Sequence, residues 1–479
     1  MTYPGTQLFI AGQWRAGAKG KTLDVVSPSS GKVLAQVARA EIADLDDAIV
    51  AVGTGFSIWS SMLAIERNRI MRKAAEQLRE RAAFIAELIT QEQGKTLTEA
   101  MGEVRASADT LEWYADESLR IYGRLVPSRV AANVRNMVVK DPIGPVAAFT
   151  PWNYPLTQVV RKVGAALAAG CALIVKAPEE TPAAPAELMR ALQEAGLPDG
   201  VVNLVFGDPA QISSYLVAHP VIRKITFTGS TAVGKQLAAL AGQYMKRASM
   251  ELGGHAPVLI AEDADLDLAV DACIAAKFRN SGQVCVSPSR FLVQSRVASA
   301  FAERFSERAK QLKVDDGMVA GSQVGPLSNP RRVLAMKKLT GDALARGATL
   351  LAGGKALDRP GNFWEPTVLF NVPADALAFN EEPFGPLASV MPFDHVEQAI
   401  EEANRLPYGL AAYAFTSSLK YSDLFIRRLQ AGLLWINMPS IPAVEMPFGG
   451  VKDSGYGSDC GPEAIEGYLV ARSISMCSH

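Results

Sequence analysis

Short apolar runs alternate with helical stretches from Gly144 onward, and this alternation limits the chain to a small set of folds. The first runs read VAAFT, CALIVKA, VVNLVFG and KITFTG, with Ala-rich or Leu-rich segments between them. Strands that are separated by helices pair in parallel, because the crossover helix returns the chain to the same edge of the sheet. This part of the chain therefore predicts a parallel α/β sheet.

A second alternating series predicts a second α/β domain. Its apolar runs are APVLIAE, RFLVQ, VMPFD, AAYAFTS and GLLWINM. At 479 residues the chain has room for two or three domains, since single cores stop growing near about 250 to 300 residues. Before both series, helical spacing from Leu45 to Tyr122 predicts helices, and the alternation within Leu125 to Lys140 predicts a strand outside the main sheet.

Composition narrows the classes of partner. Lys plus Arg total 48 against 49 Asp plus Glu, a net charge of −1, which argues against nucleic acid. The longest apolar run, Val163 to Val175, is shorter than the roughly 20 residues of a membrane helix, and the N-terminus lacks the pattern of a signal peptide. The five cysteines form no CxxC pair and the four histidines lack metal-ligand spacing. We therefore expect a cytoplasmic protein without a metal site or a membrane partner.

Three residues are candidates for covalent chemistry. Cys285 follows a Gly-Gln turn in KFRNSGQVC, and a thiol there becomes a nucleophile only where its surroundings favour the thiolate. Asn153 in TPWNYP could donate its amide to a developing negative charge, and Glu251 at the start of ELGGHAP could act as a general base. Taken singly, each has a commoner explanation: a small buried hydrophobe, a helix cap and a solvated carboxylate.

The dinucleotide fingerprint GxGxxG occurs at none of the predicted strand-to-helix turns. The nearest substitute is TFTGSTAVG, where a strand ends and a helix begins around Ser230. Amides at that helix N-terminus could hold a pyrophosphate, although Gly-Ser-Thr is also an ordinary helix cap.

Taken together, these segments resemble the aldehyde dehydrogenase superfamily over essentially the whole chain. Seven motifs occur in the family's order: TPWNYP, VKAPEETP, FTGSTAVG, MELGGHAP, GQVC, EEPFGP and MPFGGVKDSG. The resemblance implies the α/β aldehyde dehydrogenase fold with three parts: a Rossmann-like NAD-binding domain (1–123 and 141–251), an α/β catalytic domain (252–458) and a β oligomerisation arm (124–140 and 459–479).

The resemblance also implies roles for individual residues. Cys285 would be the nucleophile, Glu251 the general base and Asn153 an oxyanion donor beside the Cys285 amide. The cofactor would meet Lys176 and Glu179 at the adenosine ribose, Ser230 at the pyrophosphate, Glu382 at the nicotinamide ribose, and Trp152, Gly207, Leu252 and Phe384 along its length; Lys176 is also placed in the catalytic group.

A carboxylate at Glu179 favours NAD over NADP, because it accepts a hydrogen bond from a ribose 2′-hydroxyl and repels a 2′-phosphate. NADP remains a weaker possibility, since Lys176 offsets part of that repulsion. Glu179 could alternatively point into solvent.

Arg161 and Arg279 would clamp a carboxylate on the substrate, with Gln158 and Ser440 beside them. The chain resembles bacterial 2-oxoglutarate-semialdehyde dehydrogenases first, and succinate-semialdehyde dehydrogenases as a close alternative; glutarate semialdehyde is a third substrate. The arginines could instead form surface or subunit-interface ion pairs.

Two further expectations concern alternatives and assembly. A cysteine hydrolase or esterase would use the same thiol without a cofactor, but it would need a histidine base, and no histidine is singled out. Leu125 to Lys140 and Tyr468 to Met476 resemble the family's oligomerisation strands and imply a homodimer or homotetramer.

Overall fold

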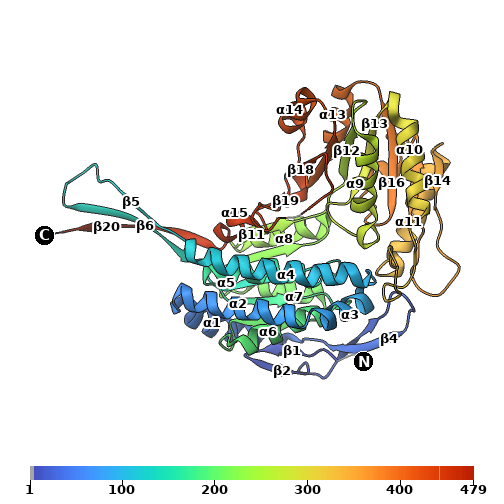
Figure 1. Cartoon of the computed structure of the whole chain (residues 1–479). Helices are drawn as coiled ribbons and strands as arrows, with labels where there is room; N and C mark the ends of the chain where they lie inside the picture. The colour runs from blue at the N-terminus through green and yellow to red at the C-terminus, as the bar shows by residue number, and fades with distance from the viewer. Residues whose placement is uncertain (1–4, 442, 479) are drawn as a thin grey trace.

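The computed structural model describes residues 5–441 and 443–478, and two large sheets dominate it (Figure 1). The eight-stranded sheet has the order β19-β11-β10-β7-β8-β9-β1-β2, and its five central strands run parallel. These strands are β7 (Val146–Phe149), β8 (Leu173–Lys176), β9 (Val202–Val205), β10 (Lys224–Thr228) and β11 (Arg247–Glu251); the antiparallel edges are β1 (Leu8–Ile10), β2 (Gln13–Arg15) and β19 (Gly455–Tyr456). The predicted parallel sheet is confirmed.

The second sheet has seven strands in the order β14-β15-β16-β13-β12-β17-β18. All its pairs are parallel except β14 with β15. Its strands are β12 (Ala256–Ile260), β13 (Pro288–Gln294), β14 (Thr349–Ala352), β15 (Thr367–Phe370), β16 (Leu387–Phe393), β17 (Ala411–Phe415) and β18 (Leu433–Ile436). Every run of the second predicted series is a strand of this sheet.

The helices of the first half of the chain lie around the eight-stranded sheet (Figure 1). The predicted helical segment contains four helices, and α2 and α3 both pack against α4. The helices of this half are α1 (Ile42–Ser61), α2 (Ala64–Glu80), α3 (Ala82–Gln93), α4 (Leu97–Glu117), α5 (Thr157–Ala169), α6 (Ala183–Ala195), α7 (Pro209–Ala218) and α8 (Thr231–Gln243). Their apolar faces and the sheet form one core, in which α5 is buried along almost its whole length.

A second set of helices packs around the seven-stranded sheet. They are α9 (Leu266–Phe278), α10 (Ser295–Lys310), α11 (Pro330–Ala345), α12 (Leu377–Asn380), α13 (Val396–Arg405) and α14 (Leu419–Arg428). A further helix, α15 (Gly461–Glu466), instead packs on α5 and belongs to the core of the first half. Among the described helices, none is by itself long and apolar enough to cross a membrane; α1 and α2, bent by 115°, meet that requirement only as a pair.

A narrow three-stranded sheet projects from the body as an arm (Figure 1). It joins β5 (Arg124–Val126), β6 (Val134–Pro142) and β20 (Leu469–Cys477), all antiparallel. Near the N-terminus, β3 (Thr22–Val26) and β4 (Val33–Ala38) form a separate hairpin. The strand predicted within Leu125 to Lys140 therefore lies outside the main sheets, as expected.

The register of the first sheet brings chemically important residues to one edge. Phe149 on β7 pairs with Phe227 on β10, and Thr228 pairs with Glu251 on β11. The carboxyl ends of these parallel strands, and the loops that follow them, consequently lie together. Ligands of open α/β sheets bind at such an edge.

Candidate functional site

Two cavities meet at Cys285, which is half-buried. The first, of about 400 Å³, opens along the carboxyl edge of the eight-stranded sheet, and the second, of about 300 Å³, lies beside α4 and α5. Gln158 and Cys285 line both. A molecule in either cavity can therefore reach the same thiol.

The loop before Cys285 has an unusual backbone. Asn280 and Ser281 adopt φ of 50° and 54°, and Gly282 has φ of 71°. A Cβ at Gly282 would lie 2.1 Å from the carbonyl oxygen of Gly385, so only glycine allows this close approach to the neighbouring loop. The left-handed turn thereby sets where Cys285 meets the cavities.

The surroundings of Cys285 do not favour the thiolate in this structure. Burial raises the pKa of the Cys285 thiol well above its ordinary value, and the nearby Glu251 raises it further, whereas Arg161 opposes the change. The thiol is therefore protonated here, and nucleophilic attack requires a group that accepts its proton.

Glu251 is a nearby carboxyl that can exchange protons at neutral pH. It ends β11, is 3% exposed, and neither carboxylate oxygen has a hydrogen-bond partner. Burial raises its pKa to about 8, and Asp459 adds to the shift, whereas Arg161 and Lys162 oppose it. A carboxyl with such a pKa is suited to general acid–base work near pH 7.

Asn153 lies in the loop between β7 and α5, ahead of the helix that carries Arg161 rather than within it. Its side-chain nitrogen Nδ2 donates a hydrogen bond to the carbonyl oxygen of Gln283 at 3.1 Å. This bond turns the amide nitrogen, rather than its oxygen, toward the Cys285 segment. The second N–H of the same group is left to meet an oxyanion.

The far part of the first cavity contains several predicted cofactor residues. The rings of Trp152 and Phe384 meet edge to face with centroids 5.6 Å apart, and Ser230 caps α8 by accepting from the amide of Val233. Glu382 accepts from the amide of Gly254 at 3.3 Å, and burial raises its pKa to about 7. Leu252 also lines this cavity.

Lys176, Glu179 and Gly207 lie elsewhere, at and beyond the ends of β8 and β9, and line neither cavity. Lys176 Nζ pairs with Glu179 at 2.6 Å, and Glu179 accepts from the Gly207 amide at 2.9 Å. Glu179 therefore does not simply point into solvent, and Lys176 does not reach the Cys285 thiol through either cavity.

Three further residues of the first cavity have no recognisable signal in the sequence. Asn329, Arg331 and Arg332 line it from the start of α11. The Arg332 guanidinium lies 5.8 Å from the ring centroid of Phe384 and donates to the carbonyl of Pro383. The segment SNPRR carries no motif, and only the fold brings it opposite the carboxyl edge of the first sheet.

The second cavity contains both predicted arginines. The Arg161 guanidinium lies 4.3 Å from the ring centroid of Phe448, and Arg279 Nη2 donates to Ser440 Oγ at 3.3 Å. Neither arginine forms an ion pair within the described residues, and the Nε atom of each is buried without a partner. The described residues therefore contain no surface ion pair of either arginine, and pairing across a subunit interface stays a prediction. Two unpaired guanidiniums in an enclosed space fit an anionic ligand.

The remaining wall of this cavity is largely apolar. It includes Tyr154, Val284, Val286, Val444 and Phe448. Two carboxylates, Glu99 and Glu103, also line this cavity. Glu99 already accepts a hydrogen bond from a backbone amide of the segment before Cys285, and Glu103 accepts from backbone amides of the segment after Asn153. The arginines consequently remain available to a ligand.

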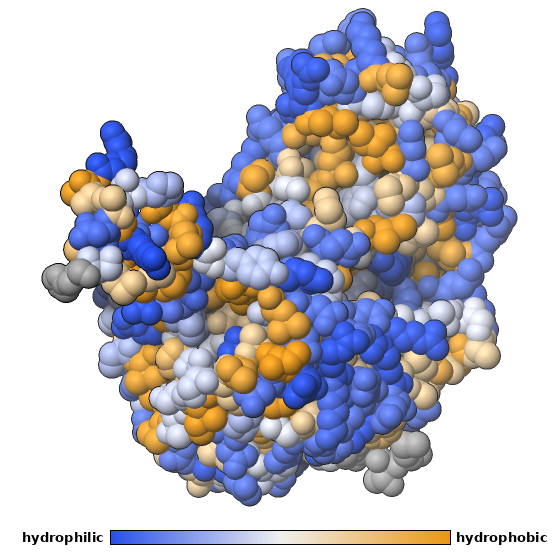
Figure 2. All heavy atoms as spheres, turned by 60° about the vertical axis from the view of Figure 1, so that its left-hand side comes forward, coloured by the Kyte–Doolittle hydropathy of each residue, from blue (hydrophilic) through white to orange (hydrophobic). Residues whose placement is uncertain are grey.

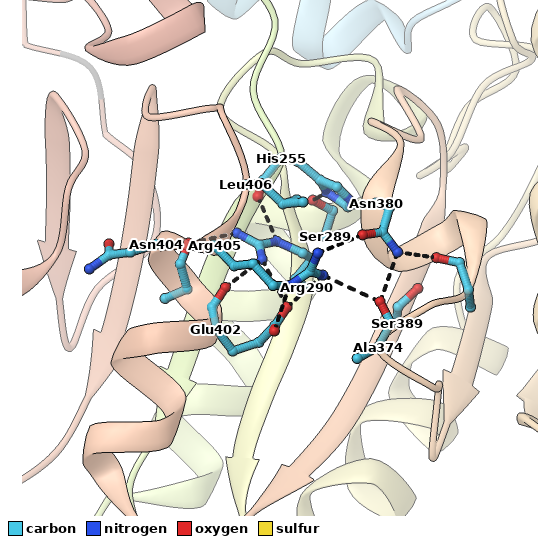
Figure 3. Close-up of polar contacts among 12 residues, drawn as sticks. His255, Ser289, Arg290, Ala374, Asn380, Ser389, Glu402, Asn404, Arg405 and Leu406 are labelled. Carbon is cyan, nitrogen blue, oxygen red and sulfur yellow. Dashed lines mark hydrogen bonds and ion pairs between the residues drawn. The ribbon is translucent and has the colours of Figure 1, made fainter.

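A buried polar network links strands of the seven-stranded sheet to α12 and α13 (Figure 3). Arg290, which is 1% exposed, donates to the carbonyls of His255, Glu402 and Ala403. Arg405 donates hydrogen bonds to both Glu402 and Asn380, and Asn380 lies two residues before Glu382. The network therefore connects the segment after Glu251 to the segment that carries Glu382.

The three described histidines, His219, His255 and His395, line neither cavity that contains Cys285. His255 Nδ1 instead contacts Ser289 Oγ at 2.7 Å. No cluster of three or more potential metal ligands occurs in residues 5–441 and 443–478. The site accordingly offers a thiol, a carboxyl, an amide and guanidiniums.

Comparisons with known proteins agree with this geometry. A family model described as the aldehyde dehydrogenase family matches residues 14–474. A 4-(hydroxymethyl)benzenesulfonate dehydrogenase of Comamonas testosteroni is 45% identical, over 98% of this chain and 97% of its own length. A succinate-semialdehyde dehydrogenase of Escherichia coli is 40% identical and a glutarate-semialdehyde dehydrogenase of Pseudomonas putida 38%, each over 98% of this chain and 97% of the relative.

Solved structures give the same result. The succinate-semialdehyde dehydrogenase of Burkholderia pseudomallei superposes with a TM-score of 0.97 at 39% identity, covering 99% of this chain and 98% of that one. An aldehyde dehydrogenase of Bacillus cereus, solved as an NAD+ complex, superposes with a TM-score of 0.97 at 32% identity, covering 99% and 97%. The chain thus belongs to the aldehyde dehydrogenase family and is an NAD(P)-dependent oxidoreductase.

Proposed function

We propose that this enzyme oxidises an aldehyde that carries an anionic group at its other end. The observation that carries the proposal is the pair of arginines in the cavity that ends at Cys285: Arg161 is buried, Arg279 is half-buried, and neither has a carboxylate partner among the described residues. Guanidiniums in an enclosed apolar space are stabilised when an anion binds between them. An anion held there directs the aldehyde carbon of a short substrate toward the thiol.

The chemistry follows from the groups around that carbon. The Cys285 thiol gives its proton to solvent water, and its sulfur attacks the aldehyde carbon, which forms a thiohemiacetal. Asn153 Nδ2 and the Cys285 backbone N–H stabilise the oxyanion. A nicotinamide dinucleotide bound in the first cavity supplies the acceptor for the hydride that this carbon loses. Glu251 then takes a proton from water, which attacks the resulting thioester and releases a carboxylic acid and the free thiol.

The residues of the first cavity suit a dinucleotide. The α8 N-terminus presents Ser230, and Thr231 Oγ1 beside it is buried without a partner. A Cβ at Gly253 would lie 2.5 Å from the Glu382 carboxylate, so glycine there leaves room for the Glu382 side chain beside the cavity. We assign Trp152, Ser230, Leu252, Glu382 and Phe384 to the cofactor.

Lys176, Glu179 and Gly207 are assigned to the adenosine end. Hydrogen bonds from Lys176 and Gly207 hold Glu179 in place, which supports its proposed role as acceptor for a ribose 2′-hydroxyl. We therefore propose a preference for NAD over NADP. Equal kcat/KM values with the two cofactors would contradict this preference.

Succinate or glutarate semialdehyde is the better supported substrate, because relatives with those names match nearly the whole chain. The sequence favours 2-oxoglutarate semialdehyde first, but neither of these relatives is named for that substrate. It retains one structural argument: Gln158 is buried between the two cavities with Oε1 unpartnered, and its amide could meet a 2-oxo group. A sulfonate-bearing aldehyde is a second candidate, since a relative named for a sulfonated substrate is 45% identical.

A substrate panel tests the anion clamp. We expect kcat/KM for succinate, glutarate and 2-oxoglutarate semialdehydes to exceed that for butyraldehyde, and Arg161→Met or Arg279→Met to lower the semialdehyde values about 10- to 100-fold. The kcat/KM value for butyraldehyde should fall only a few-fold, because butyraldehyde has no charged group for the arginines to bind. The matched variants Arg161→Lys and Arg279→Lys keep the charge and should retain part of the activity.

Two results would contradict the clamp. One is a preference of the wild type for butyraldehyde. The other is an equal loss with charged and uncharged substrates in the Arg→Met variants. A sulfonated aldehyde such as 4-sulfobenzaldehyde, included in the same panel, ranks the second candidate.

The raised pKa of Glu251 predicts a pH-dependent stability difference. Between its ordinary pKa of 4.5 and its folded value of about 8, the unfolded chain ionises this carboxyl while the folded chain keeps it protonated. Stability is therefore lost as the pH rises through that window. We expect Glu251→Gln to become more stable than the wild type by a margin that grows from about pH 5 to pH 8, measured by denaturant unfolding. A margin that stays constant or shrinks would contradict the pKa shift.

We propose that the arm mediates assembly into a dimer or tetramer. Leu125 and Val130 on the arm are 77% and 91% exposed, and apolar residues are visible along it and on the neighbouring face (Figure 2). The outer edges of β5 and β20 have no partner strand among the described residues. Deleting residues 125–133 should lower the mass measured by light scattering; a wild type that is monomeric at micromolar concentration would contradict the proposal.

A further inference from the structure

A buried ion pair at the start of α4 lies against the loop that carries Asn153. Lys95 Nζ and Glu103 Oε2 are 2.5 Å apart, and both side chains are fully buried. None of the chemical steps above needs a charge at either position. The pair is therefore a buried charged feature that the reaction itself leaves unexplained.

Both members of the pair hold the loop of Asn153. Lys95 Nζ donates to the Asn153 carbonyl oxygen at 2.9 Å and lies 3.7 Å from the ring centroid of Tyr154. The other oxygen of Glu103 accepts from the amides of Leu156 and Thr157 at 3.0 and 3.2 Å. The loop is thus fixed on both sides of its path into α5.

The same helix also holds the loop that precedes Cys285. Glu99 Oε1 accepts from the Asn280 amide at 2.7 Å, and Asn280 Nδ2 donates to the Asn153 carbonyl oxygen at 2.9 Å. Asn153 Nδ2 in turn donates to the carbonyl of Gln283. One carbonyl, that of Asn153, is therefore shared by Lys95 and by the loop that leads to the nucleophile.

Burial lowers the pKa of the Lys95 ammonium, whereas the adjacent Glu103 raises it. Lys95 thus depends on Glu103 to stay charged. Buried ion pairs are costly, and apolar replacements are often equally stable. A role in geometry accounts for the pair better than a role in stability.

We propose that Lys95 and Glu103 are positioning residues that hold the Asn153 amide at the distance from Cys285 that oxyanion binding requires. The inference rests on the proposed role of Asn153 as oxyanion donor. A shift of about 1 Å in such a group can cost on the order of 100-fold in rate.

A double-mutant cycle tests the proposal. The pair variant Lys95→Met/Glu103→Gln removes both charges but keeps an acceptor for the amides of Leu156 and Thr157. We expect it to lower kcat about tenfold or more in the wild-type background. Asn153→Ala alone should lower kcat about 100-fold or more, and adding the pair variant to it should cause no further loss, because the pair acts through Asn153.

Two further measurements separate positioning from general damage. The dissociation constant for NADH and the rate of Cys285 alkylation by iodoacetamide should stay within about twofold of wild type, since neither needs the oxyanion amide. The control is Arg72→Met/Asp116→Asn. It removes the ion pair between Arg72 Nη1 and Asp116 Oδ1, which are 2.8 Å apart at the other end of α4, and it should leave kcat unchanged.

The outcomes are distinguishable. Wild-type kcat in the pair variant, or equal losses with and without Asn153→Ala, would overturn the positioning role. Full activity of Asn153→Ala would instead overturn the oxyanion role on which it rests. If the pair variant does not fold, Glu103→Gln alone is carried through the same cycle and is judged by the same two results.

Discussion

The parallel pairing of β7, β10 and β11 is the constraint on which the site depends. Because these strands are neighbours in register, the loop with Asn153, the helix start at Ser230 and the carboxylate of Glu251 all lie at one edge of one sheet. A shift in this pairing would separate them. Cys285 comes from the other half of the chain, and its left-handed turn against Gly385 brings the thiol to that edge.

The ionisable groups around Cys285 differ in their protonation and in their hydrogen-bond partners, and these differences bear on the chemistry of the site. Glu251 is buried without a hydrogen-bond partner and with a raised pKa, so it can take up and release protons near neutral pH. The Cys285 thiol is also protonated, so it needs an acceptor before it attacks. On the proposed substrate side, the Nε atoms of Arg161 and Arg279 are buried without a hydrogen-bond partner in the protein. In the proposed function, an anionic substrate supplies that partner.

Much of this site could be predicted from the sequence, because short motifs mark its central residues. Cys285, Asn153 and Glu251 stand in segments with recognisable turns and strand ends, and the structure brings all three to one place. The prediction could not include Arg332 or Lys95. Arg332 reaches the first cavity only through the packing of α11, and Lys95 reaches the Asn153 carbonyl only through the packing of α4 on α5. The raised pKa of Cys285 likewise depends on burial, which no local pattern reports. The domain boundaries and the adenosine-end residues stay predictions.

The mechanism depends on covalent capture of the substrate by Cys285, and mass spectrometry of the Glu251→Gln enzyme can detect that intermediate. The variant is incubated with succinate semialdehyde and NAD, quenched in acid and digested. We expect a peptide containing Cys285 that is heavier by the mass of the acyl group, formed together with one equivalent of NADH. An unmodified Cys285 peptide alongside NADH formation, or an acyl group on any other residue, would contradict it.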